Sequence, residues 1–299
     1  MGADVTLRHG CFEVQVDSRL GGSCTRLRYC PGTGAQSYDV LRALPAGSCD
    51  PFEAACFALL PYSNRLFGGQ LLVPGSEPMT LAPNCNRIDV PVHGVGWMYG
   101  WTIASISDHQ VDLTLHHEPN HYWPFEMMCT QRITVTDDGV RFEASVCNIT
   151  DVAMPAGLGF HPRFNLVPNA KVALNAQAVW QQDEGGYPTI NMPVNDVERF
   201  DYRTARSAQS VAMNHCFALW SGLAQLDLPD IPLTVHLSAS PNLCYLMVYR
   251  KSEMPWLCIE PVSHATGAFS LATLNTPAHG TQWLAPGETL AGWMDLQIV

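Results

Sequence analysis

Short stretches in which apolar and polar residues alternate recur along this chain, and they restrict its fold more than any other feature. In one of them Val111, Leu113 and Leu115 alternate with polar residues, and residues 131–146 repeat the pattern on both sides of an Asp-Asp-Gly turn, as expected of a β-hairpin. The 3.6-residue period of an amphipathic helix is hard to find. Because 23 Gly and 22 Pro also interrupt the chain at short intervals, the sequence predicts an all-β protein, a large antiparallel β-sandwich.

The length of the chain is compatible with one large domain. It has 299 residues, of which 47% are hydrophobic, enough for a substantial core. Length alone suggests about two domains, but β-sandwiches often extend to roughly 200–250 residues as one unit. The sequence shows no linker, repeat or low-complexity tract, and the polar segment 168–215 is expected to form long surface loops with short strands. We therefore predict a single domain over residues 1–299.

The overall charge argues against polyanionic partners. The formal net charge is −11, and no basic stripe offsets it. A diffuse negative field disfavours nucleic acids and anionic membrane surfaces. We expect neither partner, and an uncharged small molecule is easier to reconcile with this charge than a polyanion.

The cysteines and the amino-terminal segment indicate a cytoplasmic protein. Eleven cysteines are scattered as single residues without a C-x-x-C motif, a pattern more typical of reduced thiols than of a disulfide framework. No apolar segment approaches the roughly 20 residues of a membrane span, and the first residues lack the apolar core of a secretory signal. A monomer or a homodimer is expected.

Two apolar segments each end in an ionisable residue followed by proline. GLGFHP contains His161 and CIEP contains Glu260. Because a following proline pushes a residue toward extended backbone, each side chain is expected at a strand end with a fixed direction. Such a pair suits one proton donor and one proton acceptor. A hydrogen-bonded histidine at a strand end and an ordinary surface glutamate are the alternatives.

Two further polar segments are flanked by glycine. Arg65 follows Asn64 and precedes Leu-Phe-Gly-Gly, and its guanidinium could bind vicinal hydroxyls or a carboxylate, with a surface ion pair as the alternative. His93 lies beside a glycine and close to Trp97. Its ring could hydrogen-bond a sugar hydroxyl while the indole offers an apolar face. The alternative for His93 is a core histidine bonded to backbone.

Taken together, these segments resemble the aldose 1-epimerase, or galactose mutarotase, family. PYSNRLFGG is similar to the family's arginine loop, and HGVGW to its first histidine segment. GLGFHPRFNL resembles its catalytic histidine segment, LCIEPVSHATGAF its catalytic glutamate segment, and LAPGETL its closing turn. The segments occur in the family's order, and the likeness extends from about Gly10 to Gly292, nearly the whole chain.

The resemblance implies a role for each matching residue. His161 is expected to be the general acid that protonates the ring oxygen, and Glu260 the base that takes the proton of the anomeric hydroxyl. Arg65 and His93 are expected to hold the sugar, and Asn64 is a further candidate contact. The implied fold is a large β-sandwich with the sugar in a cleft across one sheet, and the implied chemistry needs neither a metal nor an organic cofactor.

The expected reaction is the interconversion of the α and β anomers of a free aldohexose. Opening a cyclic hemiacetal needs one proton removed and one delivered, and each catalytic group supplies about 10²–10⁴-fold. We expect an ionised Glu260 and a protonated His161 on opposite sides of the pyranose, sustained by their opposite charges.

Two departures from the family pattern bear on the substrate. Asn214 stands where the family often has an aspartate that binds sugar hydroxyls, and it is the candidate contact at that position. Arg163 stands where the family usually has an aromatic residue after His-Pro. A rival substrate is therefore a phosphorylated or acidic sugar, with Arg163 or Arg87 meeting the anion.

Three other functions are alternatives: a non-catalytic sugar-binding protein, a glycoside hydrolase and a zinc enzyme. A non-catalytic sugar-binding protein of the same fold would not need the acid and the base. A glycoside hydrolase would ordinarily need a pair of carboxylates, and only one stands in a comparable setting. His117–His121 matches H-E-x-x-H, but Pro119 and the preceding alternation disfavour the helix that a zinc site requires.

Overall fold

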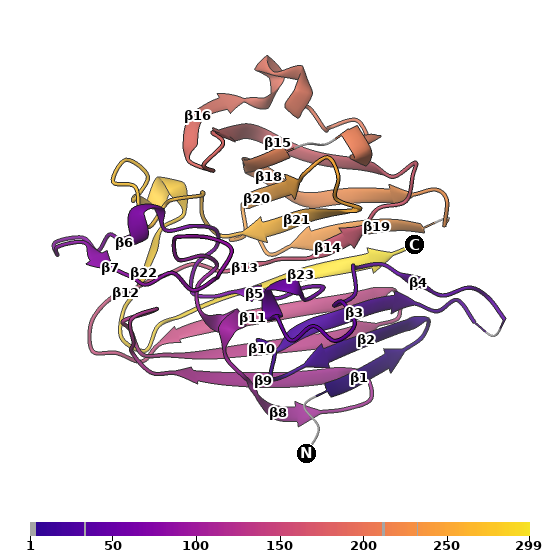
Figure 1. The fold of residues 1–299 in the computed structure, drawn as a ribbon, viewed down its shortest axis with the longest axis horizontal. Coiled ribbons are helices and arrows are strands. Elements are labelled where there is room, and N and C mark those ends of the chain that lie inside the picture. Colours follow the sequence, from indigo (N-terminus) through magenta and orange to yellow (C-terminus); the bar gives the residue numbers. More distant parts are fainter. Residues whose placement is uncertain (1–3, 33, 211–212, 232) are drawn as a thin grey trace.

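The structure is a computed structural model in which residues 4–32, 34–210, 213–231 and 233–299 are described. Within these ranges every helix is a short 3₁₀ turn and the rest of the regular structure is strand. A four-stranded antiparallel sheet forms the amino-terminal layer (indigo in Figure 1). It contains β1 (Asp4–His9), β2 (Phe12–Asp17), β3 (Ser23–Tyr29) and β4 (Tyr38–Asp39).

A much larger sheet forms the second layer, in the order β5-β13-β21-β20-β18-β19-β23-β11-β10-β9-β8. Its lower half in Figure 1 contains β8 (Thr102–Ile106), β9 (Gln110–His117), β10 (Met127–Thr136), β11 (Gly139–Asn148) and β23 (Thr289–Ile298). Strand β19 (Leu233–Ala239) joins β23 to β18. Its other half contains β5 (Ala58–Leu59), β13 (Gly159–Phe160), β14 (Arg163–Asn165), β15 (Lys171–Gln182), β16 (Pro188–Pro193), β17 (Arg206–Ser207), β18 (Met213–Leu228), β20 (Tyr245–Arg250) and β21 (Trp256–Val262).

Short elements complete the fold. Two small sheets pair β6 (Gln70–Leu71) with β7 (Met79–Thr80) and β12 (Met154–Ala156) with β22 (Gln282–Leu284). The 3₁₀ turns are η1 (Pro51–Glu53), η2 (Phe67–Gly69), η3 (Gly96–Met98), η4 (Val194–Asp196), η5 (Glu198–Phe200), η6 (Ala208–Ser210) and η7 (Pro277–His279). The all-β prediction is confirmed, and the segment 131–146 forms the predicted hairpin of β10 and β11.

The main core lies between the two layers. Strands β9, β10 and β23 alternate buried and more exposed residues, as expected when one face of a sheet packs inward. Leu7 and Val14 of the small sheet belong to the same buried cluster as Leu113 and Ile133 of the large sheet. The alternation that predicted strands therefore also identifies the face that stabilises the sandwich.

Strands β20 and β21 differ because they are buried on both faces. Almost every residue of these two strands is inaccessible to solvent, including polar ones. One face belongs to the core, and the other is covered by segments between β4 and β8, which cross the middle of the molecule in Figure 1. This covered face holds the polar residues discussed below.

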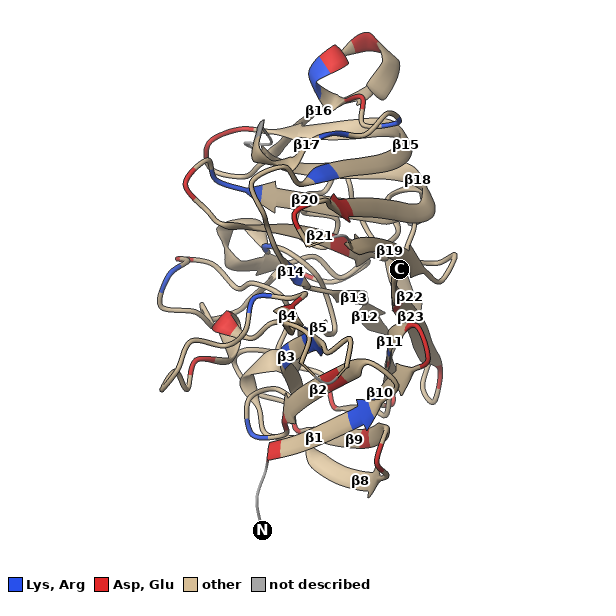
Figure 2. Cartoon of the chain, turned by 90° about the vertical axis from the view of Figure 1, so that its right-hand side faces the viewer, with Lys and Arg blue, Asp and Glu red and all other residues tan. Residues whose placement is uncertain are grey.

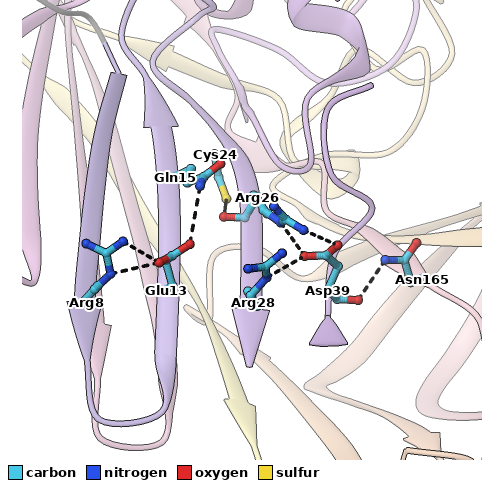
Figure 3. Close-up of polar contacts among 8 residues, drawn as sticks. All are labelled: Arg8, Glu13, Gln15, Cys24, Arg26, Arg28, Asp39 and Asn165. Atoms are coloured by element: carbon cyan, nitrogen blue, oxygen red, sulfur yellow. Dashed lines mark hydrogen bonds and ion pairs between the residues drawn. The ribbon is translucent and has the colours of Figure 1, made fainter. Parts of the chain in front are cut away.

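Polar contacts tie the small sheet to the large one, as Figure 3 shows. On the outer face of the small sheet Arg26 binds Asp39 through two hydrogen bonds of 2.6 and 2.9 Å. Asn165 Nδ2 of β14 donates to the backbone oxygen of the same Asp39 at 2.8 Å. Since β14 also carries Arg163, this contact anchors one wall of the polar region.

Two details of the sequence interpretation are tested by the fold. The polar segment 168–215 is not mainly loop, because β15 extends over twelve residues whose alternate side chains Val172, Leu174 and Ala176 are buried. His117 lies at the end of a strand and its ring contacts the backbone oxygen of Trp123, so H-E-x-x-H is not on a helix.

All eleven cysteines are free thiols. No helix among the described residues is long and apolar enough to cross a bilayer.

Candidate active site

The fold brings His161 and Glu260 together on the covered face. Glu260 lies on β21, and His161 follows β13, which pairs with β21. The His161 backbone N–H donates to Phe57 O at 2.9 Å, and its ring stacks on the Phe57 ring at 4.8 Å. His161 Nε2 and Glu260 Oε1 are 3.3 Å apart, and both side chains are buried. The two residues that sequence reasoning paired therefore form one unit.

Cys258 occupies the other side of the imidazole. Its Sγ lies 3.8 Å from His161 Nδ1. Burial and the nearby Glu260 hold the pKa of the Cys258 thiol well above its ordinary value, so a protonated thiol lies beside Nδ1. Nε2, on the opposite side of the ring, is the nitrogen that faces Glu260.

Burial pushes both members of the pair toward their neutral forms. It raises the pKa of Glu260 to about 8, against a smaller lowering by Arg163. It also holds the pKa of His161 well below its ordinary value, helped by Arg163 and His93. Around pH 7 the site therefore favours a protonated Glu260 beside a neutral His161. This differs from the predicted pair of ions, although both forms hold one proton.

The arrangement of the pair also differs from the prediction. The imidazole of His161 and the carboxyl group of Glu260 are 3.3 Å apart, too close for a pyranose to lie between them. Both groups therefore belong to one wall of the site. The ring oxygen and the anomeric oxygen are bonded to the same carbon, so adjacent groups can address both. Side-by-side placement also lets one proton pass between the two residues.

A second wall is formed by His93 and Asn64. The Asn64 backbone N–H donates to His93 Nδ1 at 3.1 Å, and the His93 backbone N–H donates to Asn64 O at 2.9 Å. Burial, Arg163 and Arg65 lower the pKa of His93 to about 3, so the ring is neutral. Because Nδ1 accepts a hydrogen bond, the proton is on Nε2 and His93 is a hydrogen-bond donor.

The glycine after His93 allows this wall to form. Gly94 has φ +66°, and a Cβ there would lie 1.9 Å from Leu60 O. That oxygen also accepts hydrogen bonds from Val95 N and Gly96 N. We predict that Gly94→Ala lowers the free energy of unfolding by on the order of 3 kcal/mol or more, measured by urea denaturation.

Gly75→Ala is the matched control. Gly75 has φ +77° but no atom within 4 Å of its added Cβ, so the substitution carries only the conformational penalty of about 1–2 kcal/mol. Equal losses in the two variants would show that close approach to Leu60 does not constrain the His93 wall.

These groups line one cavity of about 370 Å³, within the size range of small-molecule sites. Of the sequence candidates, it brings together Asn64, Arg65, His93, His161, Asn214 and Glu260. Trp97 is not in this lining. It is buried, its ring N–H donates to Val92 O at 3.3 Å, and its edge packs on Phe52 at 5.2 Å. Trp97 thus supports the wall from behind.

Arg65 and Asn214 line the cavity from different segments of the chain. Arg65 Nη1 donates to Gly185 O at 3.0 Å, at the turn between β15 and β16. Asn214 lies on β18 and pairs with Tyr249 of β20. His264, just after β21, accepts a 3.0 Å hydrogen bond from Ser63 N, which fastens the arginine loop to the glutamate segment.

Arg163 is buried at the base of the cavity. Its guanidinium donates to the carbonyl oxygens of Ala54 and Phe52. Its Cζ also lies 5.4 Å from the Phe57 ring and 5.7 Å from the Trp256 ring. Arg163 is therefore held by carbonyls and aromatic faces, and its charge acts on His161 and Glu260 through space.

Sequence reasoning missed several lining residues. They are Arg42, Phe52, Glu53, Ile88, Val92, Met247, Tyr249, Lys251, Met254 and Trp256. Tyr249 and Trp256 belong to strands that are buried on both faces, and only the pairing of β20 with β21 places them on the same face as Glu260. The sequence did contain a signal for Trp256. Residues an even number of positions apart on one strand face the same side, so Trp256 shares a face of its strand with Glu260.

The same cluster has a geometry that a metal ion can use. Ligand atoms of His161, Cys258 and Glu260 lie within 4.8 Å of one another. Burial raises the pKa of the Cys258 thiol, so a metal ion would have to displace the thiol proton in order to bind there. The cluster therefore fits proton transfer better.

Comparison with known proteins agrees with the geometry. The family model described as aldose 1-epimerase matches residues 4–297. The chain is 27% identical over 257 residues to the uncharacterized protein YphB of Escherichia coli, covering 82% of this chain and 84% of that protein.

Solved structures share the fold. A galactose mutarotase-like protein from Clostridium acetobutylicum has a TM-score of 0.84 at 19% identity, covering 99% of this chain and 95% of that one. The GalM/aldose epimerase homologue from C. elegans has a TM-score of 0.81 at 15% identity, with 99% of both chains covered. From a family match that spans almost its whole length, the chain belongs to the aldose 1-epimerase family.

Proposed function

We propose that this protein is an isomerase that interconverts the α and β anomers of a free aldohexose. The observation that carries the proposal is the buried His161–Glu260 pair, with 3.3 Å between Nε2 and Oε1, in a cavity of sugar size. Asn64, Arg65, His93 and Asn214 are the proposed sugar contacts. Trp97 is proposed only as support for His93.

The pair is suited to ring opening because it holds one mobile proton. In the productive state the carboxylate of Glu260 takes the proton of the anomeric hydroxyl while His161 delivers a proton to the ring oxygen. The C1–O5 bond breaks, and the anomeric oxygen becomes a carbonyl. After rotation of C1 the same transfers run in reverse and close the ring. Proton count is conserved over the cycle.

The neutral His93 has a separate role in the proposal. A neutral donor can hydrogen-bond a sugar oxygen without adding a positive charge beside His161. It thereby orients the sugar and leaves the proton of the catalytic pair in place. Arg65 and Asn214 supply further hydrogen bonds to the sugar.

The pH dependence follows from the proton count. Between the lowered pKa of His161 and the pKa of Glu260 near 8, the pair holds one proton. Above about pH 8 it holds none, so no acid remains. We predict that kcat/KM for a neutral sugar is level near pH 7 and falls with a midpoint near 8, after subtraction of buffer catalysis. A midpoint near 6.5, typical of an unperturbed imidazole, would contradict the assignment.

Polarimetry on freshly dissolved pure anomers tests the activity. The protein should accelerate equilibration of α-glucose or α-galactose, or of another hexose in a small panel, in proportion to its concentration. Equilibration at the buffer rate for every sugar, substituted hexoses included, would leave a non-catalytic sugar-binding protein as the better account.

A further inference from the structure

We infer that the preferred substrate is an anionic hexose, one that carries a phosphate, sulfonate or carboxylate away from its anomeric carbon. The inference rests on the proposed anomer conversion and specifies its substrate class. It starts from the charge of the cavity. Five of the chain's 16 Lys and Arg residues line it, against two carboxylates. The basic residues are Arg42, Arg65, Arg87, Arg163 and Lys251.

This concentration contrasts with the rest of the molecule. The chain has a formal net charge of −11, and Figure 2 shows acidic and basic positions spread from one end of the molecule to the other. The overall charge favoured an uncharged ligand, but a ligand in the cavity experiences the local charge. Positively charged linings concentrate anions and discriminate against cations.

The basic side chains of the cavity differ in whether nearby carboxylates neutralise their charges. Arg87 Nη2 pairs with Asp50 at 2.8 Å and with Glu53 at 2.9 Å. Among the described residues, the other four basic side chains form no ion pair with a carboxylate. Arg163 is occupied with the carbonyls of Ala54 and Phe52. Arg65 donates to Gly185 O at 3.0 Å, whereas Arg42 makes only a long contact of 3.5 Å from Nη1 to Glu53 O. The charges best placed to meet an added anion are therefore those of Arg42 and Lys251.

Arg42 and Lys251 lie away from Glu260, where the proposed reaction takes place. For Lys251 this follows from the register between β20 and β21. Glu260 pairs with Met247, and Cys258 pairs with Tyr249. Trp256 and Lys251 continue the two strands beyond that pair, away from Glu260. Four residues of strand from Glu260 to Trp256 span about 13 Å.

Arg42 joins the same end of the cavity. Its Cζ lies 5.8 Å from the centre of the Trp256 ring, and its backbone N–H donates to Arg163 O at 2.7 Å. A hexose with its anomeric carbon at Glu260 extends along the strands toward this basic end. A planar guanidinium and an ammonium there can bind a phosphate, a sulfonate or a carboxylate.

The test compares anomer conversion for neutral hexoses, hexose 6-phosphates, a 6-sulfonated hexose and hexuronates. We expect kcat/KM for at least one anionic class to exceed that for the matching neutral hexose by about tenfold or more, as one charge-assisted hydrogen bond allows. The identity of the favoured class distinguishes phosphate, sulfonate and carboxylate. Added NaCl should reduce the preference.

Two cavity variants test which side chains bind the anionic group of the substrate. Arg42→Gln and Lys251→Gln should each lower the anionic-to-neutral ratio of kcat/KM by about tenfold. Lys171→Gln is the matched control, because Lys171 is the chain's other lysine, is exposed and lies on β15 outside the cavity lining. The control should leave the ratio unchanged.

Several results would overturn the inference. One is wild-type conversion of neutral hexoses as fast as that of every anionic one. Another is an unchanged ratio in both cavity variants. Conversion of neutral sugars alone would contradict the anionic preference and leave the proposed function standing. If no sugar were converted, the proposed function would fail, and calorimetric binding of a hexose 6-phosphate against the neutral hexose would still measure the charge preference.

Discussion

Glu260→Gln should slow anomer conversion by about 10²–10⁴-fold, because an amide cannot take the proton of the anomeric hydroxyl. The fold should survive the change. Glu260 is buried, and burial raises its pKa to about 8, so the folded protein at pH 7 already holds a neutral side chain of the same shape. We expect a melting temperature close to that of the wild type. Polarimetry and thermal denaturation on one preparation give both quantities.

The combination of these readouts makes the prediction specific. A variant that melts like the wild type and still converts anomers at the wild-type rate would remove Glu260 from the reaction. Loss of activity together with loss of folding would be a structural effect, and Glu260→Asp then serves as the second variant. Aspartate keeps the carboxylate but shortens its reach, so it should retain more activity than glutamine if proton transfer is the role.

His161→Asn should have an effect of similar size, about 10²–10⁴-fold. Asparagine can donate a hydrogen bond, but it cannot exchange a proton with the ring oxygen near neutral pH. The variant also removes the ring that stacks on Phe57 at 4.8 Å, so part of any stability change reflects lost packing. The rate of anomer conversion at saturating sugar is the relevant measurement.

His117→Asn is the matched control for this loss. His117 is also buried, contacts the backbone oxygen of Trp123 and lies outside the cavity lining. It should leave the rate at the wild-type value whatever its effect on stability. Equal rate losses in the two histidine variants would indicate that burial of a histidine, and not proton delivery, explains the result.

Much of the fold follows from local sequence. Alternation in segments such as Val111–Leu115 places one face of a strand in the core, and the Asp-Asp-Gly turn sets the β10–β11 hairpin. The segment 168–215 was harder because its polar composition concealed β15. There Val172, Leu174 and Ala176 are the buried alternate residues, and Ala176 pairs with the bulky Trp220 of β18.

The candidate site was predictable where proline or glycine limits the backbone. His161 and Glu260 each precede proline, and Asn64 and His93 stand in loops with positive φ. These positions meet in one cavity. The orientation of Trp97 and the contributions of Arg42 and Trp256 were not predictable, because they depend on contacts between segments far apart in the chain.

The protonation state was also beyond sequence reasoning. Opposite charges on His161 and Glu260 seemed to favour a pair of ions, but the degree of burial favours the neutral forms. Desolvation disfavours each charge, and Arg163 disfavours a second positive charge on His161. Only the packing of Phe57 and the segments over β20 and β21 reveals this.

The most direct test of the account is magnetisation exchange between the α and β anomeric protons of a hexose at equilibrium, measured by NMR. Wild-type protein should produce exchange proportional to its concentration. The His161→Asn/Glu260→Gln double variant should produce none above buffer, and each single variant should fall nearly as far, since the two groups act in one step. Exchange by the double variant at the wild-type rate would contradict the account.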